Sequence, residues 1–261
     1  MMIDTLHMAL GAVSGLMVGF SLGLVGGGGS ILAVPLMVYL VGVQSPHVAI
    51  GTSALAVAAN AFTGLVQHAR QHTVKWRCGA IYAGAGIAGA FAGSTLGKSV
   101  DGQKLLFLFA LLMIVIGVVM LRSRNAMGLP GAQCNRENAP KVVAYGLGTG
   151  AFSGFFGIGG GFLIVPGLIA STSMPMINAV GTSLVAVTAF GLTTAANYAV
   201  SGLVDWVLAA VFIVSGALGG FFGTAMAKRL SSGGSLKTVF AMLVFVVAAY
   251  MLYQSGQALW A

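Results

Sequence analysis

Charged residues are scarce in this sequence. Of its 261 residues, 6% are charged and 58% are hydrophobic, whereas a soluble domain carries about 25% charged residues. This composition excludes a water-soluble fold and predicts an all-helical polytopic membrane protein embedded in a lipid bilayer. The formal net charge of +8 lies in short loops between apolar segments, where basic residues orient a membrane protein. We therefore predict no nucleic-acid partner.

Cysteines and acids are also few. Cys78 and Cys134 have no CxxC spacing and no neighbouring histidine pair, which favours two unpaired thiols over a disulfide or a metal site. No charged residue occurs in residues 5–69 or 142–204. Because a membrane-embedded enzyme, a metal site or a carboxylate-based antiporter needs clustered ligating or acidic side chains, we predict no catalytic residue, no metal and no cofactor. The four acids lie in a terminus or a predicted loop: Asp4, Asp101, Glu137 and Asp205.

Glycine, by contrast, is abundant, with 40 residues. Two stretches concentrate it, "GLVGGGGSILAVP" at Gly23–Pro35 and "GFFGIGGGFLIVP" at Gly154–Pro166. Each stretch puts a glycine cluster before a short apolar run and a proline. Such a cluster predicts a break between two helices in an otherwise apolar part of the chain.

The glycine stretches belong to a longer internal repeat. Gly51-Thr52-Ser53 is matched by Gly181-Thr182-Ser183, and Trp76 by Trp206, at an offset of about 130 residues. Residues 6–121 and 142–254 thus form two copies of one unit. We expect a first membrane unit at 1–121, a polar linker at 122–141 and a second membrane unit at 142–261.

Loop charges predict that the two copies are inverted. The loop with Arg70, Lys75 and Arg77 is basic, as is the 122–141 linker, and both are expected in the cytoplasm. The corresponding loop of the second copy, "YAVSGLVDW", has one acid and no base, and is expected outside. Inverted repeats are typical of secondary transporters. The pattern places both termini outside the cytoplasm.

Opposite orientation requires an odd number of crossings in each copy. One helix at Leu6–Val25 spans, but residues 30–43 extend only roughly 21 Å at about 1.5 Å per residue, against about 30 Å of hydrocarbon. We therefore favour a re-entrant helical hairpin at 30–43 and 48–67, while three tight spans keep the same parity. Each copy then has about three spanning helices plus a short broken or re-entrant hairpin. The other expected spans are Ala80–Leu96, Leu105–Leu121, Leu208–Ala227 and Thr238–Tyr253.

The glycine breaks are candidate substrate sites. Irregular backbone at membrane depth persists only where it is buried in protein or lines a cavity, and free N–H groups at the start of the following helix favour an anion. The alternative is that these glycines only permit close helix packing. Neither cluster continues into GK[ST], so neither is an ATP-binding loop. The candidate residues are Gly26, Gly27, Gly28, Gly29, Ser30, Gly157, Gly159, Gly160 and Gly161.

Polar side chains in the hairpins complete the candidate site. Asn60 and Asn197 lie in the apolar stretches, and Asn197 matches Gln67 of the first copy. Amides and hydroxyls can donate hydrogen bonds to an oxoanion without adding a charge that would trap it. For the hydroxyls the alternative is a bond to the preceding helical carbonyl. The hydroxyl candidates are Thr52, Ser53, Thr182 and Ser183.

The duplicated "GxxGxGGG…P…GTS" unit is similar to that of the sulfite exporter TauE/SafE family, over nearly the whole chain outside the linker. The resemblance implies secondary transport of sulfite, an organosulfonate or a related small anion across the bacterial inner membrane. Family relatives that carry thiosulfate have pore cysteines, which the motif regions here lack. An anion channel of the same architecture and a homo-oligomeric assembly remain open.

Overall fold

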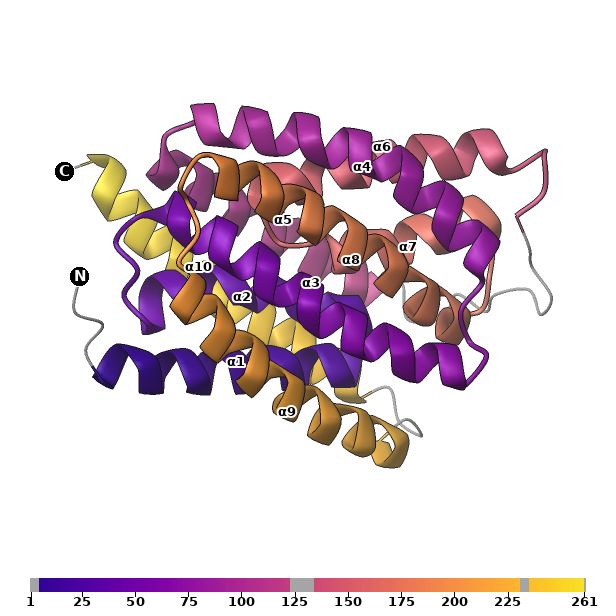
Figure 1. Ribbon diagram of the computed structural model, residues 1–261, viewed down its shortest axis with the longest axis horizontal. Coiled ribbons are helices and arrows are strands. Elements are labelled where there is room, and N and C mark those ends of the chain that lie inside the picture. Colours follow the sequence, from indigo (N-terminus) through magenta and orange to yellow (C-terminus); the bar gives the residue numbers. More distant parts are fainter. Residues whose placement is uncertain (1–4, 123–133, 231–234, 261) are drawn as a thin grey trace.

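The computed structural model describes residues 5–122, 134–230 and 235–260, and the elements of these residues are all helical (Figure 1). The elements are α1 (Thr5–Val25), the 3-10 segment η1 (Gly26–Leu32), α2 (Ala33–Pro35), the π-helical turn η2 (Leu36–Leu40), α3 (Pro46–Arg70), α4 (Trp76–Ser99), α5 (Gly102–Arg122), α6 (Ala139–Phe156), α7 (Gly161–Thr172), α8 (Met176–Val200), α9 (Trp206–Leu230) and α10 (Ser235–Trp260).

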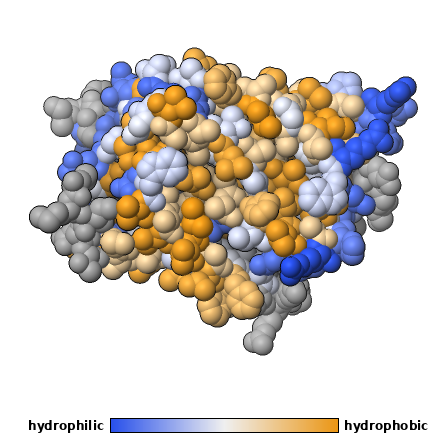
Figure 2. Space-filling view, in the orientation of Figure 1, coloured by the Kyte–Doolittle hydropathy of each residue, from blue (hydrophilic) through white to orange (hydrophobic). Residues whose placement is uncertain are grey.

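The outer surface matches a lipid environment. In the face drawn in Figure 2, apolar side chains form a belt across the middle and hydrophilic ones gather at the two ends. Within the described residues, five helical stretches are long and apolar enough to cross a membrane: Leu6–Gly23, Pro46–Arg70, Trp76–Ser99, Met176–Val200 and Trp206–Thr224. Shorter apolar helices occupy Gly29–Leu40, Gly102–Val118 and Gly161–Thr172. The prediction of an all-helical membrane protein is confirmed.

Two pairs of parallel helices are packed through glycine. Along α1 and α9, a Cβ added to Gly15 would lie 2.8 Å from the Phe212 carbonyl oxygen, and one added to Gly23 would lie 2.7 Å from the Thr224 nitrogen. Residue numbers rise together on both helices, so α1 and α9 run in the same direction. The helices α4 and α6 pack in the same way. These glycines let two backbones approach more closely than any side chain would allow.

The centre of the molecule is the antiparallel pair α3 and α8. A Cβ on Gly191 of α8 would lie 2.9 Å from the Ala58 Cβ of α3, whereas Gly51 of α3 lies beside Leu203, just after α8. Residues early in α3 thus contact residues late in the α8 region, so the two helices run in opposite directions. Around this pair, α3 packs on α9, α8 packs on α4, and α5 packs on α10.

The expected hairpin reaches deeper than a shallow re-entrant loop. Its first arm is short and broken into η1, α2 and η2, as predicted, but its second arm is α3, whose 25 residues extend about 37 Å. The turn between the arms lies beside the start of α1, because a Cβ on Gly42 would be 3.9 Å from Nε2 of His7. The chain thus runs back along α1 in the first arm and forward again in α3, and of these two arms only α3 is long and apolar enough to cross a membrane.

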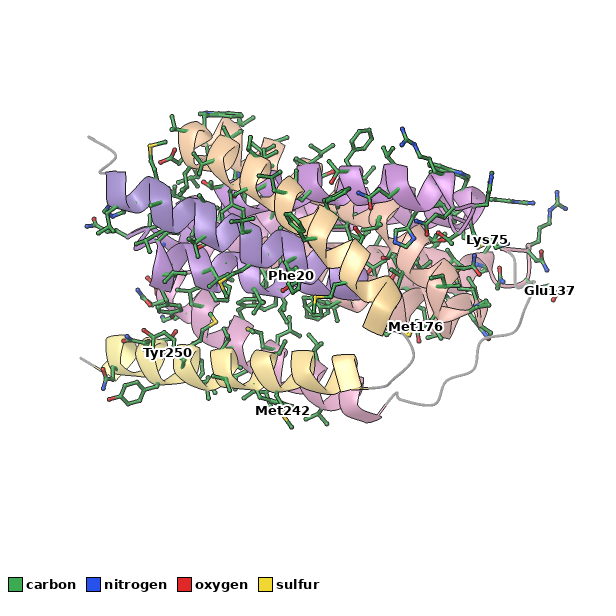
Figure 3. All side chains as sticks on the ribbon, turned by 90° about the horizontal axis from the view of Figure 1, so that it is seen from below. Phe20, Lys75, Glu137, Met176, Met242 and Tyr250 are labelled. Atoms are coloured by element: carbon green, nitrogen blue, oxygen red, sulfur yellow. A yellow bond between two sulfur atoms is a disulfide. The ribbon has the colours of Figure 1, made fainter. Side chains whose placement is uncertain are left out.

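The two ends of the bundle differ in charge. Lys75 and Glu137 lie at one end and Tyr250 toward the other (Figure 3). We call the first the basic end, because it carries Arg70 and Lys75 at the α3–α4 junction and the start of α6. The second is the terminal end, where α1 begins and α10 ends (Figure 1). The start of α1 and the end of α10 thus lie at the opposite end of the bundle from the α3–α4 junction.

The two cysteines are joined in a disulfide, so the prediction of two unpaired thiols is wrong for this structure. Their Cα atoms are 5.4 Å apart, and the side chains are 1% and 3% exposed. Cys78 lies in the first turn of α4, and Cys134 shortly precedes α6. Because α4 and α6 run parallel, their starts meet at the basic end. No spacing rule reveals such a pairing, since it depends on which helices are neighbours.

Candidate functional site

The second glycine break has a backbone that only glycine adopts readily. Gly157, Gly159 and Gly160 have φ of +67°, +65° and +64°, in the left-handed region that side chains with a Cβ avoid. Gly157 ends α6, and α7 begins at Gly161. Three left-handed residues in four reverse the chain direction within a single turn. This is the local reason for the cluster "GIGGG".

Apolar side chains from the central helices wall this break. A Cβ on Gly159 would lie 2.9 Å from Cγ1 of Val57 in α3 and 3.3 Å from Cγ1 of Val187 in α8. Ile158, between the left-handed glycines, is fully buried. Val57 and Val187 lie near the middle of their helices, so the break sits at the centre of the bundle. Irregular backbone in such a place must be shielded by protein or line a cavity.

The start of α7 presents backbone donors at this point. The first α-helical hydrogen bond of α7 runs from the Ile164 N–H to the Gly160 carbonyl at 3.0 Å. The N–H groups of Gly161 and Phe162 precede it and so have no partner within the helix. With the helix dipole behind them, they favour a negatively charged or electron-rich group.

Ser153 adds a hydroxyl that sequence reasoning missed. Its Oγ is buried and has no hydrogen-bond partner, and a Cβ on Gly160 would lie 2.9 Å from it. In the sequence Ser153 looks like one more small packing residue between glycines, which is the commoner role in a membrane helix. The structure places its hydroxyl beside the left-handed turn.

The first glycine break has a different conformation. Gly26–Leu32 winds as a 3-10 helix, which eclipses residues three apart and is therefore eased by the lack of side chains at Gly26 and Gly29. A Cβ on Gly29 would lie 2.7 Å from the Ser21 carbonyl oxygen in α1. Ser30 is fully buried. The segment η1 packs against α7, so the two breaks predicted to form one site are neighbours in the structure.

The hydroxyls of the Gly-Thr-Ser motifs bond to helix backbones, although the first motif follows directly after Ile50, whose carbonyl oxygen would lie 3.3 Å from a Cβ on Gly157 in the second break. Thr52 Oγ1 accepts a hydrogen bond from the Asp205 N–H at 2.9 Å, and Thr182 Oγ1 accepts one from the Lys75 N–H at 2.9 Å. Each threonine thereby binds the backbone just before α9 or α4. Ser53 and Ser183 donate to the carbonyls of Ile50 at 3.0 Å and Val180 at 2.7 Å in their own helices. We therefore leave these four hydroxyls out of the proposed site.

The two asparagines have different surroundings. Asn197 Nδ2 donates to Ser94 Oγ at 2.6 Å, and its Oδ1 accepts from Lys98 Nζ at 2.8 Å, so its amide bridges α8 and α4 near the terminal end. Asn60 is only 6% exposed, and neither of its amide atoms has a partner. It lines a cavity between α1, α3 and α9. The structure thus separates the two amides rather than bringing them together.

Metal-binding clusters were not expected from the sequence. In the described ranges no group of three or more histidine, cysteine or acidic side chains could hold a metal ion.

Comparison with known proteins places the chain in a family of membrane proteins. The model of the family described as "Sulfite exporter TauE/SafE" matches residues 11–251. The chain is 52% identical over 261 residues to a "Probable membrane transporter protein" of Xylella fastidiosa (strain 9a5c), covering 99% of both chains. It is 24% identical over 263 residues to the "Probable membrane transporter protein YunE" of Bacillus subtilis, covering 93% of this chain and 96% of that one. No solved structure matches the chain. The chain therefore belongs to the sulfite exporter TauE/SafE family of membrane transporters.

Proposed function

We propose that the chain is a secondary transporter of a small sulfur oxoanion, sulfite or an organosulfonate, and that the anion binds where the two glycine breaks meet. The observation that carries this proposal is the turn at Gly157–Gly161. It puts free helix N–H groups and the Ser153 hydroxyl at the centre of an apolar bundle. The breaks at Gly26–Ser30 and Gly157–Gly161 are the proposed contacts.

Neutral donors suit a transported anion. Each backbone or hydroxyl donor contributes about 0.5–1.5 kcal/mol, and more when its acceptor is charged. Several donors together support modest affinity while leaving the anion free to depart. No lysine or arginine lies in residues 142–204 or 5–69, so no fixed cation would hold the anion at the breaks.

We further propose that residues 1–121 and 142–261 are inverted units joined by the 122–141 linker. The helix packing supports this proposal. Each helix of one unit has a counterpart about 130 residues away in the other unit, and helices that contact each other have counterparts that also contact each other. The pair α1–α9 corresponds to α6–α4, and the bond from Asp205 to Thr52 corresponds to that from Lys75 to Thr182. Inverted units offer two related conformations, open to opposite sides.

The orientation follows from charge. The basic end would face the cytoplasm by the positive-inside rule, although the disulfide at that end is of a kind that the cytoplasm disfavours, and α1 would begin and α10 end on the outer side of the bacterial inner membrane. At the terminal end, Lys98 and Lys104 are balanced by Asp101 and Asp205, so no comparable excess of positive charge opposes this orientation.

Flux into proteoliposomes tests the proposed function. We expect sulfite or sulfoacetate to be taken up down its gradient by liposomes containing the protein, with sulfate, a neutral solute and a cation as controls. Gly159→Trp, which fills the turn, serves as the inactive matched control if it elutes as folded protein. Uptake of the cation alone would contradict an anion site at the breaks.

A further inference from the structure

A small cavity lies outside the glycine breaks, between α1, α3 and α9. Its volume is about 20 Å³, room for about one water molecule. Glycines form the walls on α1 and α9, namely Gly19, Gly23, Gly216 and Gly220. Asn60 and Gln67 of α3 supply amides to the lining. Glycine walls and amide groups make a space that is narrow but polar.

Asn60 is the least satisfied polar group at this cavity. Its Nδ2 and Oδ1 have no hydrogen-bond partner although the side chain is 6% exposed, and a Cβ on Gly216 would lie 2.9 Å from its Cγ. Leaving a buried amide unpaired costs about 1–3 kcal/mol. Because the Asn60 amide lines a cavity, a polar molecule in that cavity could form the hydrogen bonds that the protein does not supply.

The equivalent position in the second half of the chain is closed. The counterpart of Asn60, about 130 residues on, is Phe190, and the counterpart of Gly216 is Gly86. Phe190 is fully buried, contacts Gly86 and stacks on Tyr82 with ring centroids 6.4 Å apart. The space beside the equivalent glycine is therefore filled by the Phe190 ring in one half, whereas in the other half it is a cavity lined by the Asn60 amide.

The cavity extends toward the basic end. Gln67 and His68 are partly exposed, and α3 ends at Arg70, ten residues beyond Asn60, or about 15 Å along the helix. No acidic side chain lines the cavity, so an anion entering it would meet amide donors without a repelling carboxylate.

We propose that this cavity is the narrowed form of a hydrated access route from the basic end, in which the transported anion contacts Asn60, and that Phe190 closes the equivalent route in the other half. The identity of the anion rests on the proposed function, whereas the route itself does not. The two halves of this transporter are then unlike at this position despite the repeated sequence, and access from the terminal end must follow a different path.

Cysteine accessibility tests the route. In a background with both native cysteines replaced by serine, Asn60→Cys and Gly64→Cys are each treated with a membrane-impermeant maleimide on either face of sealed vesicles. A Cβ on Gly64 would lie 3.5 Å from Leu184 Cδ1, an ordinary contact, so the second variant should fold even if the first does not. Met113→Cys, on a fully buried side chain of α5, is the matched control.

We expect both cavity cysteines to react several-fold faster from the basic-end face, and sulfoacetate to slow the reaction. Sulfoacetate is the probe because sulfite itself consumes maleimides. Labelling no faster than that of the Met113→Cys control, or faster from the terminal end, would overturn the route. Labelling that sulfoacetate leaves unchanged would overturn the anion contact. If sulfite flux persisted in either case, the proposed function would survive.

A filling variant tests the comparison with Phe190. Asn60→Phe should be accommodated, because Gly216 stands opposite it as Gly86 stands opposite Phe190. We expect folded protein with anion flux largely lost, while Asn60→Gln, which keeps the amide, retains flux. Normal flux through folded Asn60→Phe would contradict the proposal.

Discussion

Two glycine-to-alanine substitutions in α4 distinguish the stability effect of close helix packing from that of intrinsic helix propensity. Gly93 faces α6, and a Cβ added there would lie 2.8 Å from the Ala151 carbonyl carbon and 3.0 Å from its Cα. Gly84 of the same helix has no atom within 4 Å of an added Cβ. The two substitutions therefore add the same methyl group to the same helix, one against a backbone and one into open space.

The two variants should shift stability in opposite directions. Alanine is favoured over glycine within a helix by about 1 kcal/mol, which Gly84→Ala should gain. Ordinary contacts begin at 3.4 Å, and the Ala151 backbone cannot turn aside as a side chain could. Gly93→Ala must therefore push α4 and α6 apart, and overpacking of this kind costs about 1–3 kcal/mol. We expect Gly93→Ala to be about 2–4 kcal/mol less stable than Gly84→Ala, because one variant gains about 1 kcal/mol while the other loses about 1–3 kcal/mol.

Thermal unfolding in detergent, followed by the monodisperse fraction on size exclusion, measures the difference. At about 2–4 °C per kcal/mol for a chain of this size, the two midpoints should differ by about 4–16 °C, with the wild type between them. Equal midpoints would refute the reasoning, because they would mean that the close approach of α4 and α6 contributes nothing to stability.

Three further outcomes are expected. Gly159→Ala should leave folded protein with poor anion flux, because its φ of +65° is unfavourable for alanine and its Cβ would enter the break; unchanged flux would contradict the site. Thr182→Val should lower unfolding free energy by about 0.5–1.5 kcal/mol without changing flux per folded molecule, and Thr182→Ser should restore it; a flux loss with unchanged stability would return this hydroxyl to the site. In a background without the two native cysteines, Ser201→Cys and Asn135→Cys should label from opposite faces of cells, with Ser201→Cys reached from outside; labelling of both from outside would exclude the proposed orientation.

The sequence predicts this fold well where the pattern is local. Helix breaks at two glycine clusters, the short first arm of the hairpin and the membrane class all follow from composition and spacing. Three features depend on which helices become neighbours and cannot be read locally. These are the disulfide between Cys78 and Cys134, the depth of the hairpin turn beside His7, and the bond from the Lys75 backbone to Thr182.

The candidate site was only partly predictable. The left-handed turn at Gly157–Gly160 follows from the glycine cluster, but the first cluster forms a 3-10 helix despite its similar sequence. Ser153 carries no sequence signal, because a small hydroxyl between glycines is equally suited to packing. The contrast between Asn60 and Phe190, however, is visible in the sequence once the two copies are aligned, and only its consequence required the structure.

The pairing of α1 with α9 determines when α1 can complete its packing during synthesis of the chain. The glycine face of α1 finds its partner only after about 200 further residues have been made, which takes about 10–40 s at about 5–20 residues per second. During that time α1 lies in the membrane with its small-residue face against lipid or a translocation factor. The corresponding pair, α4 and α6, closes much sooner, since α6 begins at Ala139. The first half of the chain must therefore remain an unfinished assembly until α9 arrives, and α1 is the helix most exposed to quality control.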